Sequence, residues 1–269
     1  MTVAEAPKIE LTEAQKQQYL DKGYVIIPDI LDEGEIEKYK TRAREIAHGT
    51  IPPDHKKRIV RDVRVAKGLY KPEDPEMGMW KYLNPDRWDP LFHDFACTPR
   101  LLDVLEGLIG PYLKTFLTMF IYKPPGINAV HHYHQDGLYF RFGPQELIAG
   151  TWLPLDDADA ENGTMRVIPG SHKFGILPHV TPKEENVNMG VFGVVGYDDH
   201  PDEVVCEMKA GDCLFFHSRL LHKTGGSTSD RHRRVITVHF AGSKCKPEGM
   251  IGSEFEFRLV RGQSYEGCV

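Results

Sequence analysis

The chain has 269 residues, of which 41% are hydrophobic and 27% charged, and its 33 Lys and Arg against 39 Asp and Glu give a formal net charge of −6. This composition is typical of a globular protein with one large domain or two small ones. The acidic balance argues against nucleic-acid binding, and no apolar stretch approaches the roughly 18 residues of a membrane span. Five cysteines without a C-x-x-C pair argue against a disulfide framework and favour a reducing compartment.

The first part of the chain is predicted to form two short helices around one strand. Thr12 and Gln15 have the spacing of a capping box, so we expect a short helix to begin there. The apolar run Tyr24–Ile27 has the residues of a β-strand. Asp32, with a glutamate three residues later, caps a second helix that we expect to run to about residue 48.

The next segment, residues 54–71, is basic and has no regular pattern, so we expect it to be irregular. Its charges form either a solvated surface, which we favour slightly, or a binding site for a phosphate or carboxylate group. Thr98-Pro99 then begins a helix that Gly110-Pro111 ends. Five aliphatic side chains share one face of this helix: Leu101, Leu102, Leu105, Leu108 and Ile109.

After Pro111 the sequence changes to short β-rich runs between Gly and Pro turns. Six runs are predicted as strands: residues 115–122, 148–155, 165–168, 204–208, 214–216 and 235–240. Their spacing favours an antiparallel sandwich or barrel, with the helices packed on its outside. Residues 183–203 have few apolar anchors and several glycines, so we expect a long loop there that acts as a lid.

The histidines indicate a metal site. One run reads H-H-Y-H-Q-D, and in an extended strand His132, His134 and Asp136 would share a face. A second group, His217 and His222, follows a predicted strand. Two histidines and one carboxylate on a β-scaffold form the facial triad that binds non-haem Fe(II) and leaves open coordination positions. Because an H-x-D pair is common by chance, ordinary core or surface histidines are the alternative.

Arg233 strengthens the interpretation as a metal site. It stands eleven residues after His222, at the start of a predicted strand. A buried guanidinium there can bind a carboxylate through two parallel hydrogen bonds. The alternative for this arginine-rich stretch is a solvated basic turn, and strand alternation places only Arg231 on the same face as Arg233.

Four blocks of the sequence, in order and over nearly the whole chain, resemble the phytanoyl-CoA dioxygenase family of Fe(II)- and 2-oxoglutarate-dependent oxygenases. The similarity lies in the blocks together, since no single one is specific. The blocks are GYVIIPDILDEGEIEKYK (23–40), HQDG (134–137), TWLPLDDADAENGTMRVIPGSH (151–172) and GDCLFFHSRLLHKTGGSTSDRHRR (211–234).

The resemblance implies a mainly β fold with flanking helices. The core would be a double-stranded β-helix, the jelly-roll or cupin-like fold, with the N-terminal helices packed outside. We expect a single domain over residues 1–269, with a helical and strand support region at 1–112 and the core at 113–262. The loop 183–203 would be an insertion in this core.

The resemblance also assigns site residues. It makes His134, Asp136 and His222 both the iron ligands and the catalytic centre, and it leaves His217 outside the set. Arg233 would bind the distal carboxylate of 2-oxoglutarate. Three further positions match residues that line this cosubstrate in the family: Gln135, Trp152 and Thr224.

Together these parts imply an enzyme that uses Fe(II), 2-oxoglutarate and O2. Decarboxylation of 2-oxoglutarate to succinate and CO2 would be coupled to hydroxylation of a C–H bond, although desaturation or ring closure would use the same ligands. The substrate would be a small molecule, with no nucleic-acid or membrane partner, and the sequence does not indicate an oligomeric state. The candidate substrate contacts follow the metal motif: Tyr139, Phe140 and Arg141.

Two other classes of function are consistent with the same ligands. One is a β-barrel that binds a metal or an anion without catalysis, because a fold does not guarantee an activity. The other is a metal-dependent hydrolase, which would have no use for Arg233. Formation of succinate distinguishes these classes. We expect the enzyme in the cytoplasm, since the last residues do not form the peroxisomal signal S-K-L.

Overall fold

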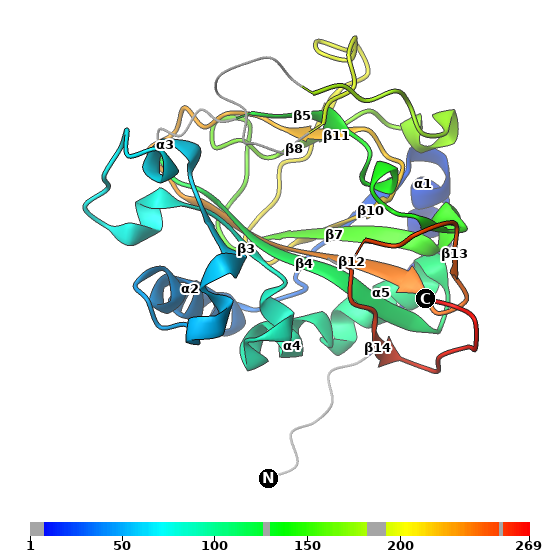
Figure 1. Cartoon of the computed structure of the whole chain (residues 1–269). Helices are drawn as coiled ribbons and strands as arrows, with labels where there is room; N and C mark the ends of the chain where they lie inside the picture. Colours follow the sequence, from blue (N-terminus) through cyan, green and yellow to red (C-terminus); the bar gives the residue numbers. More distant parts are fainter. Residues whose placement is uncertain (1–7, 126–129, 182–191, 253–254) are drawn as a thin grey trace.

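The computed structural model describes residues 8–125, 130–181, 192–252 and 255–269 (Figure 1). Its α-helices are α1 (Glu13–Lys22), α2 (Glu33–Ala47), α3 (Val63–Ala66), α4 (Pro90–Ala96) and α5 (Pro99–Ile109). Its strands are β1 (Tyr24–Ile27), β2 (Ile59–Arg61), β3 (Met79–Leu83), β4 (Leu113–Lys123), β5 (His131–His134), β6 (Phe142–Gly143), β7 (Ile148–Pro154), β8 (Met165–Val167), β9 (Val204–Val205), β10 (Cys213–His217), β11 (His222–Thr224), β12 (Arg233–Gly242), β13 (Lys246–Pro247) and β14 (Arg258–Arg261).

Two antiparallel sheets face each other in this structure. The large sheet has the strand order β1-β10-β7-β12-β4-β3-β2, and β14 also pairs with β4. The small sheet has the order β5-β11-β8-β9 and lies above the large one in Figure 1. Non-consecutive strands are neighbours in both sheets, as in a jelly roll. The mainly β, double-stranded β-helix fold expected from the sequence is therefore confirmed.

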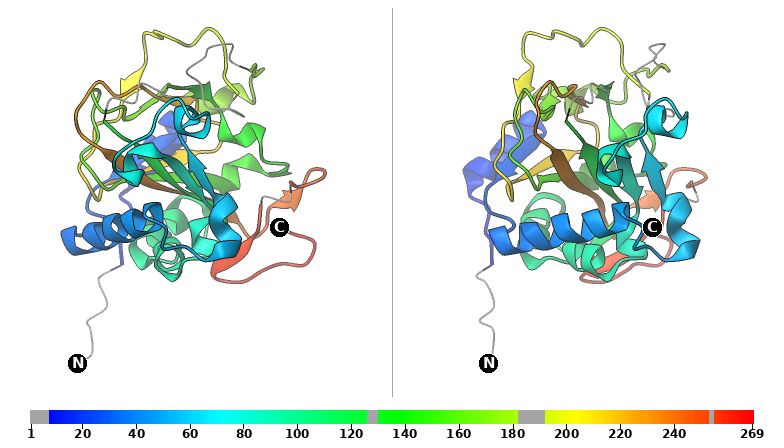
Figure 2. Two further views of the ribbon diagram at one scale, coloured as in Figure 1. Left: turned by 60° about the vertical axis from the view of Figure 1, so that its left-hand side comes forward. Right: turned by 90° about the vertical axis from the view of Figure 1, so that its left-hand side faces the viewer.

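The helices α2, α4 and α5 cover the face of the large sheet that points away from the small sheet (Figures 1 and 2). Aromatic side chains form this contact: the ring of Phe92 on α4 meets Phe120 on β4 edge-on, with centroids 5.6 Å apart, and both are fully buried. The prediction that the helices pack outside the core is confirmed. In the part of the chain that the structure describes, every helix is too short or too polar to span a bilayer.

Because side chains alternate along each strand, the two faces of the large sheet have different roles. On β12, Ile236, Val238 and Phe240 join the core under the helices. The alternate residues Arg233, Thr237 and His239 face a cavity between the sheets instead. One strand therefore stabilises the fold with one face and supplies polar groups to a site with the other.

The N-terminal elements agree closely with the sequence prediction. Thr12 and Gln15 form the capping box of α1, and Asp32 and Glu35 form that of α2. Gly23 ends α1 in the left-handed conformation, with φ at 83°. Such a conformation is strained for a residue with a Cβ atom, which explains a glycine at this position.

The expectation of an irregular segment at 54–71 is wrong. A 3-10 helix at Pro53–Arg58, strand β2 and helix α3 lie there, because β2 pairs with β3 at the edge of the large sheet. The sequence analysis also missed α4 and several short strands. Residues 182–191, which include the first nine residues of the expected lid 183–203, lie outside the described residues, so the lid stays a prediction, as does the division into a support region and a core.

A stability prediction follows from the contact between α4 and β4. Phe92→Ala is expected to lower the free energy of unfolding by about 3–5 kcal/mol, since it removes a buried ring and leaves a cavity beside Phe120. Leu20→Ala on α1 is the control, because this side chain is 60% exposed, and we expect a change within about 0.5 kcal/mol. Urea denaturation of the two variants measures both values, and equal losses would contradict the assignment of the core.

Candidate metal centre

Two neighbouring strands of the small sheet bring two histidines together. His134 is the last residue of β5 and His222 the first of β11, and the two are direct antiparallel partners. Their ring centroids are 4.1 Å apart. Asp136 lies two residues after His134 and is the first residue of a 3-10 turn that runs to Leu138. The turn brings the carboxylate back toward the two rings.

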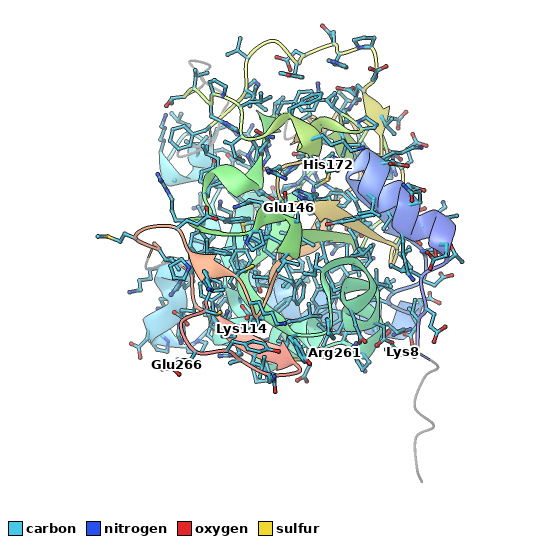
Figure 3. All side chains as sticks on the ribbon, turned by 90° about the vertical axis from the view of Figure 1, so that its right-hand side faces the viewer. Lys8, Lys114, Glu146, His172, Arg261 and Glu266 are labelled. Atoms are coloured by element: carbon cyan, nitrogen blue, oxygen red, sulfur yellow. The ribbon has the colours of Figure 1, made fainter. Side chains whose placement is uncertain are left out.

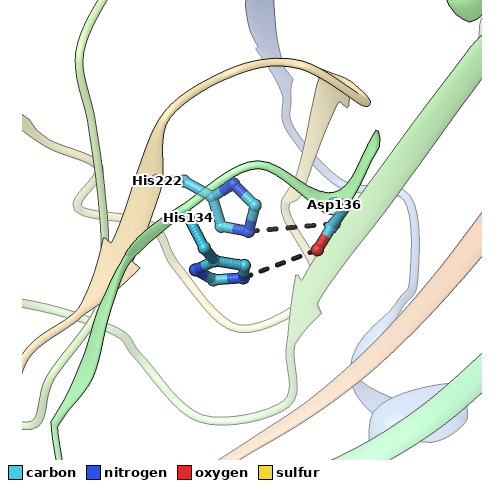
Figure 4. Close-up of side chains that lie close together, drawn as sticks. All are labelled: His134, Asp136 and His222. Carbon is cyan, nitrogen blue, oxygen red and sulfur yellow. Dashed lines mark ion pairs between the residues drawn. The ribbon is translucent and has the colours of Figure 1, made fainter. Parts of the chain in front are cut away.

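The three side chains form a compact donor set (Figure 4). Nε2 of His134 lies 3.5 Å from Oδ1 of Asp136, and Nε2 of His222 lies 3.8 Å from Oδ2. One ligand atom from each residue fits within 4.8 Å of the others. Two imidazoles and one carboxylate are the donors of a non-haem Fe(II) site, so the residues fit this ion.

Backbone carbonyls fix the orientation of both imidazoles. Nδ1 of His134 is 2.8 Å from the carbonyl of His132, and Nδ1 of His222 is 2.9 Å from that of Leu220. A carbonyl only accepts, so each Nδ1 carries the proton and donates it. Each Nε2 then presents a lone pair toward the centre of the group, which is the arrangement that a metal needs.

The protonation states suit a cation at neutral pH. Burial alone would raise the pKa of Asp136, but the nearby His222 and His239 outweigh it and hold this pKa well below 3.8. Burial, together with the neighbouring His134, lowers the pKa of His222 to about 4. The group therefore consists of a charged carboxylate and a neutral imidazole at His222.

These residues line a cavity of about 400 Å³ between the sheets. This volume suits a small molecule. Four apolar side chains from β4 and from residues near the C-terminal strand form much of one wall: Leu117, Met119, Ile121 and Phe255. Of the predicted cosubstrate and substrate residues, the cavity is lined by Arg233, Trp152, Thr224, Tyr139 and Phe140.

Arg233 is a buried cation in this cavity. Its side chain is 1% exposed, and its guanidinium carbon lies 5.3 Å from the ring centre of Trp152. Among the described residues, neither Nε nor Nη1 has a hydrogen-bond partner. Burial lowers its pKa to about 10, so it remains charged at neutral pH. A buried charge without a partner is costly, so this position is built for an anion.

Lys81 on β3 adds a second cation that the sequence analysis did not single out. It lines the same cavity, and its Nζ lies 4.1 Å from the ring centre of Trp80. Burial lowers its pKa to about 8, which still leaves most of it charged at neutral pH. Cations on the cavity wall, Arg233 and Lys81 among them, suit a dianion, and 2-oxoglutarate is one.

Two predicted site residues do not reach the cavity. Gln135 is fully buried, but its amide nitrogen donates to the carbonyls of Gly175 and Arg219, at 2.8 and 2.7 Å. Its Oε1 accepts from the backbone N–H of Leu177 at 2.8 Å. Arg141 is exposed and does not line the cavity. The structure thus places Gln135 as a brace between loops and Arg141 at the surface.

The expectation that His132 shares the face of His134 and Asp136 is wrong. The chain leaves the strand after His134, so period-two alternation no longer applies to Asp136. His131 lies on the cavity instead and stacks on His134, with ring centroids 4.1 Å apart and planes 8° apart. The side chain of His132 lies against the backbone of Gly193.

His217 belongs to a separate buried cluster. Its ring lies 5.2 Å from that of His172, which Figure 3 shows beside α1, and 6.5 Å from that of Tyr19. Its Nδ1 accepts from the backbone N–H of Arg219 at 3.0 Å, and burial lowers its pKa to about 3. His217 does not line the cavity.

Comparison with known proteins identifies the family. The family model described as Phytanoyl-CoA dioxygenase (PhyH) matches residues 19–235. The chain belongs to the phytanoyl-CoA dioxygenase family. The peroxisomal phytanoyl-CoA dioxygenase of Mus musculus is 31% identical over 91% of this chain and 73% of its own length. A probable phytanoyl-CoA dioxygenase of Caenorhabditis elegans is 31% identical over 86% of this chain and 75% of its own length.

Solved structures share the fold of this family member. The epimerase SnoN, in complex with Fe3+, alpha ketoglutarate and nogalamycin RO, has a TM-score of 0.68 at 21% identity, covering 93% of this chain and 98% of SnoN. EvdO2 from Micromonospora carbonacea var. aurantiaca, complexed with 2-oxoglutarate, has a TM-score of 0.68 at 18% identity, over 92% and 97% of the two chains. The family membership confirms the predicted class, an iron- and 2-oxoglutarate-dependent dioxygenase, and its cofactors.

The separate location of His217 gives a direct test of the distal ligand. His217→Ala is expected to keep the metal stoichiometry of the wild type, because its ring faces α1 rather than the cavity. His222→Ala is expected to lose metal binding, because it removes one of three donors. Anaerobic Fe(II) titration of the purified variants measures both, with urea denaturation as the control for folding. If His217→Ala lost iron while His222→Ala kept it, the ligand would be His217 rather than His222.

Proposed function

We propose that the protein hydroxylates a C–H bond of a small-molecule substrate, with 2-oxoglutarate converted to succinate and CO2. In this proposal His134, Asp136 and His222 bind the iron, and Arg233 binds the distal carboxylate of 2-oxoglutarate. Trp152 and Thr224 line the cosubstrate. The observation that carries the proposal is the buried, unpartnered guanidinium of Arg233 in the same cavity as the two histidines and the carboxylate.

The protein's own groups support such a reaction by position and charge. Bound iron and 2-oxoglutarate would supply the activation of dioxygen that oxidises an unactivated C–H bond. Because three ligands meet at the centre among the residues that the structure describes, coordination positions remain for small molecules. In this proposal Arg233 orients a carboxylate, and the nearby ring of Trp152 stabilises the charge of the guanidinium. A hydrolase would have no use for this buried arginine.

Apolar side chains on the cavity walls support the proposal that the substrate binds there through apolar contacts. Tyr139 and Phe140 face it, and Leu117, Met119 and Phe255 extend the same apolar surface. Such a surface excludes water from the reacting centre, which protects a strong oxidant from side reactions. Arg141 is exposed, so its expected contact with the substrate has no support from its position.

The compartment is a further part of the proposal. The name of the mouse relative places that protein in the peroxisome. We infer the cytoplasm for this chain, because all five of its cysteines are free thiols, as is usual in a reducing compartment. Fractionation of cells that express the full chain, with a peroxisomal and a cytoplasmic marker, tests this inference.

The carboxylate of the triad is the first test of the reaction. Asp136→Ala is expected to abolish succinate formation in the presence of Fe(II), ascorbate, 2-oxoglutarate and a broad panel of substrates, since it removes the anionic ligand. Asp21→Ala, whose side chain is 59% exposed, is the control and keeps wild-type activity. Succinate formation that survives Asp136→Ala would reject the assignment of the ligands.

The role of Arg233 has its own test. Arg233→Ala is expected to raise the KM for 2-oxoglutarate about 10- to 100-fold, because a charged hydrogen bond contributes about 1.5–3 kcal/mol. Arg231→Ala is the matched control: this arginine is 42% exposed and pairs with Asp159 at 2.6 Å, so the KM should not change. The opposite pattern would transfer the role to Arg231.

A further inference from the structure

His239 on β12 makes a contact for which the proposed function has given no role. Its Nε2 lies 2.7 Å from Oδ2 of Asp136, and its side chain is 2% exposed. It lies on the same face of β12 as Arg233 and lines the same cavity. Residues an even number apart on a strand share a face, and His239 is six residues after Arg233. The sequence alone therefore indicates that the two side chains lie on the same side of the strand.

Aromatic rings hold His239 in place. Phe140 and Phe216 meet its ring edge-on, with centroids 5.5 and 6.1 Å away, and Phe116 lies 6.0 Å away. Among the described residues its Nδ1 is buried without a hydrogen-bond partner. Asp136 therefore receives the one side-chain hydrogen bond that is recorded for this imidazole.

This environment fixes which nitrogen carries the proton. A carboxylate accepts hydrogen bonds, so Nε2 must donate to Asp136. The hydrogen bond therefore needs the form of His239 that carries a proton on Nε2.

The two oxygens of Asp136 consequently differ. Oδ2 accepts from His239 at 2.7 Å and lies 3.8 Å from Nε2 of His222, whereas Oδ1 is the oxygen nearer His134, 3.5 Å from its Nε2. A carboxylate without such a donor is free to rotate and to chelate a cation through both oxygens. One fixed oxygen leaves the other as the available ligand.

We propose that His239 is a positioning residue, whose Nε2–H holds Oδ2 of Asp136 so that the carboxylate presents a single oxygen to the metal. This inference rests on the proposed function, because it takes Asp136 as a metal ligand. Its consequence is that the number of protein ligand atoms stays at three, which keeps positions open for 2-oxoglutarate and dioxygen.

A matched pair of amides tests this role. The amide of His239→Gln reaches the place of Nε2 and can donate to Asp136, whereas the shorter amide of His239→Asn cannot. Co(II), added to the full chain, reports both affinity and ligand geometry through its visible spectrum. We expect His239→Asn to weaken Co(II) binding about 10- to 100-fold and to change the spectrum, as for other groups that orient a metal ligand. His239→Gln should restore both toward the wild type.

Controls separate this role from a merely structural one. His217→Gln and His217→Asn change another buried histidine that lies outside the cavity, and both should leave the Co(II) spectrum unchanged. Urea denaturation follows folding, and His239→Leu replaces the Asn variant if the latter does not fold. Equal Co(II) binding by the Gln and Asn variants would overturn the inference. A wild-type chain that binds no Co(II) would overturn the proposed metal site as well.

Discussion

The register between β5 and β11 is the constraint on which the site depends. Pairing His222 with His134 places two imidazoles on one side of the small sheet, with ring centroids 4.1 Å apart. A shift by one residue would turn one ring to the opposite face, because side chains alternate along a strand. On its other side β11 pairs with β8, where His222 is opposite Val167. The small sheet thus fixes the spacing of the donors through backbone hydrogen bonds on both sides.

The charges of the cavity are local and differ from those of the whole chain. The chain has a net charge of −6, yet Arg233 and Lys81 place positive charges in the same cavity as the carboxylate of Asp136. Interactions between these groups are strong because the apolar wall lowers the local dielectric constant. Solvent screens the acidic surface, so the net charge has little influence inside the cavity.

Much of the fold was readable from local sequence patterns. The capping residues Thr12 and Asp32 and the strand Tyr24–Ile27 were predicted at the positions where the structure has them. Patterns of this kind depend on a few neighbouring residues. Strands β2 and β3 were missed because they are stabilised by pairing with each other and with β4, and such distant partners leave little trace in a short stretch of sequence.

The residues of the site were likewise predictable from the sequence only where local patterns mark them. The sequence indicated His134, Asp136 and Arg233 from residue type and spacing, and the structure places them in one cavity. It did not indicate that Asp136 begins a turn, which is why His132 was wrongly placed beside it. Lys81 was missed for a different reason: it comes from strand β3, some 50 residues before His134, and only the fold brings it to the cavity.

Gln135 joins His134 and Asp136, the two proposed ligands of the H-x-D motif, to loops far away in the chain. Its amide binds the backbone at Gly175, Leu177 and Arg219, and its own backbone N–H donates to Nε2 of His179 at 3.0 Å. The segment around residues 175–179 therefore acts as part of the frame of the metal centre although it supplies no ligand. Insertions or deletions there would break the hydrogen bonds that hold Gln135 between His134 and Asp136, so this segment is tied to the candidate metal centre more closely than its distance along the chain would indicate.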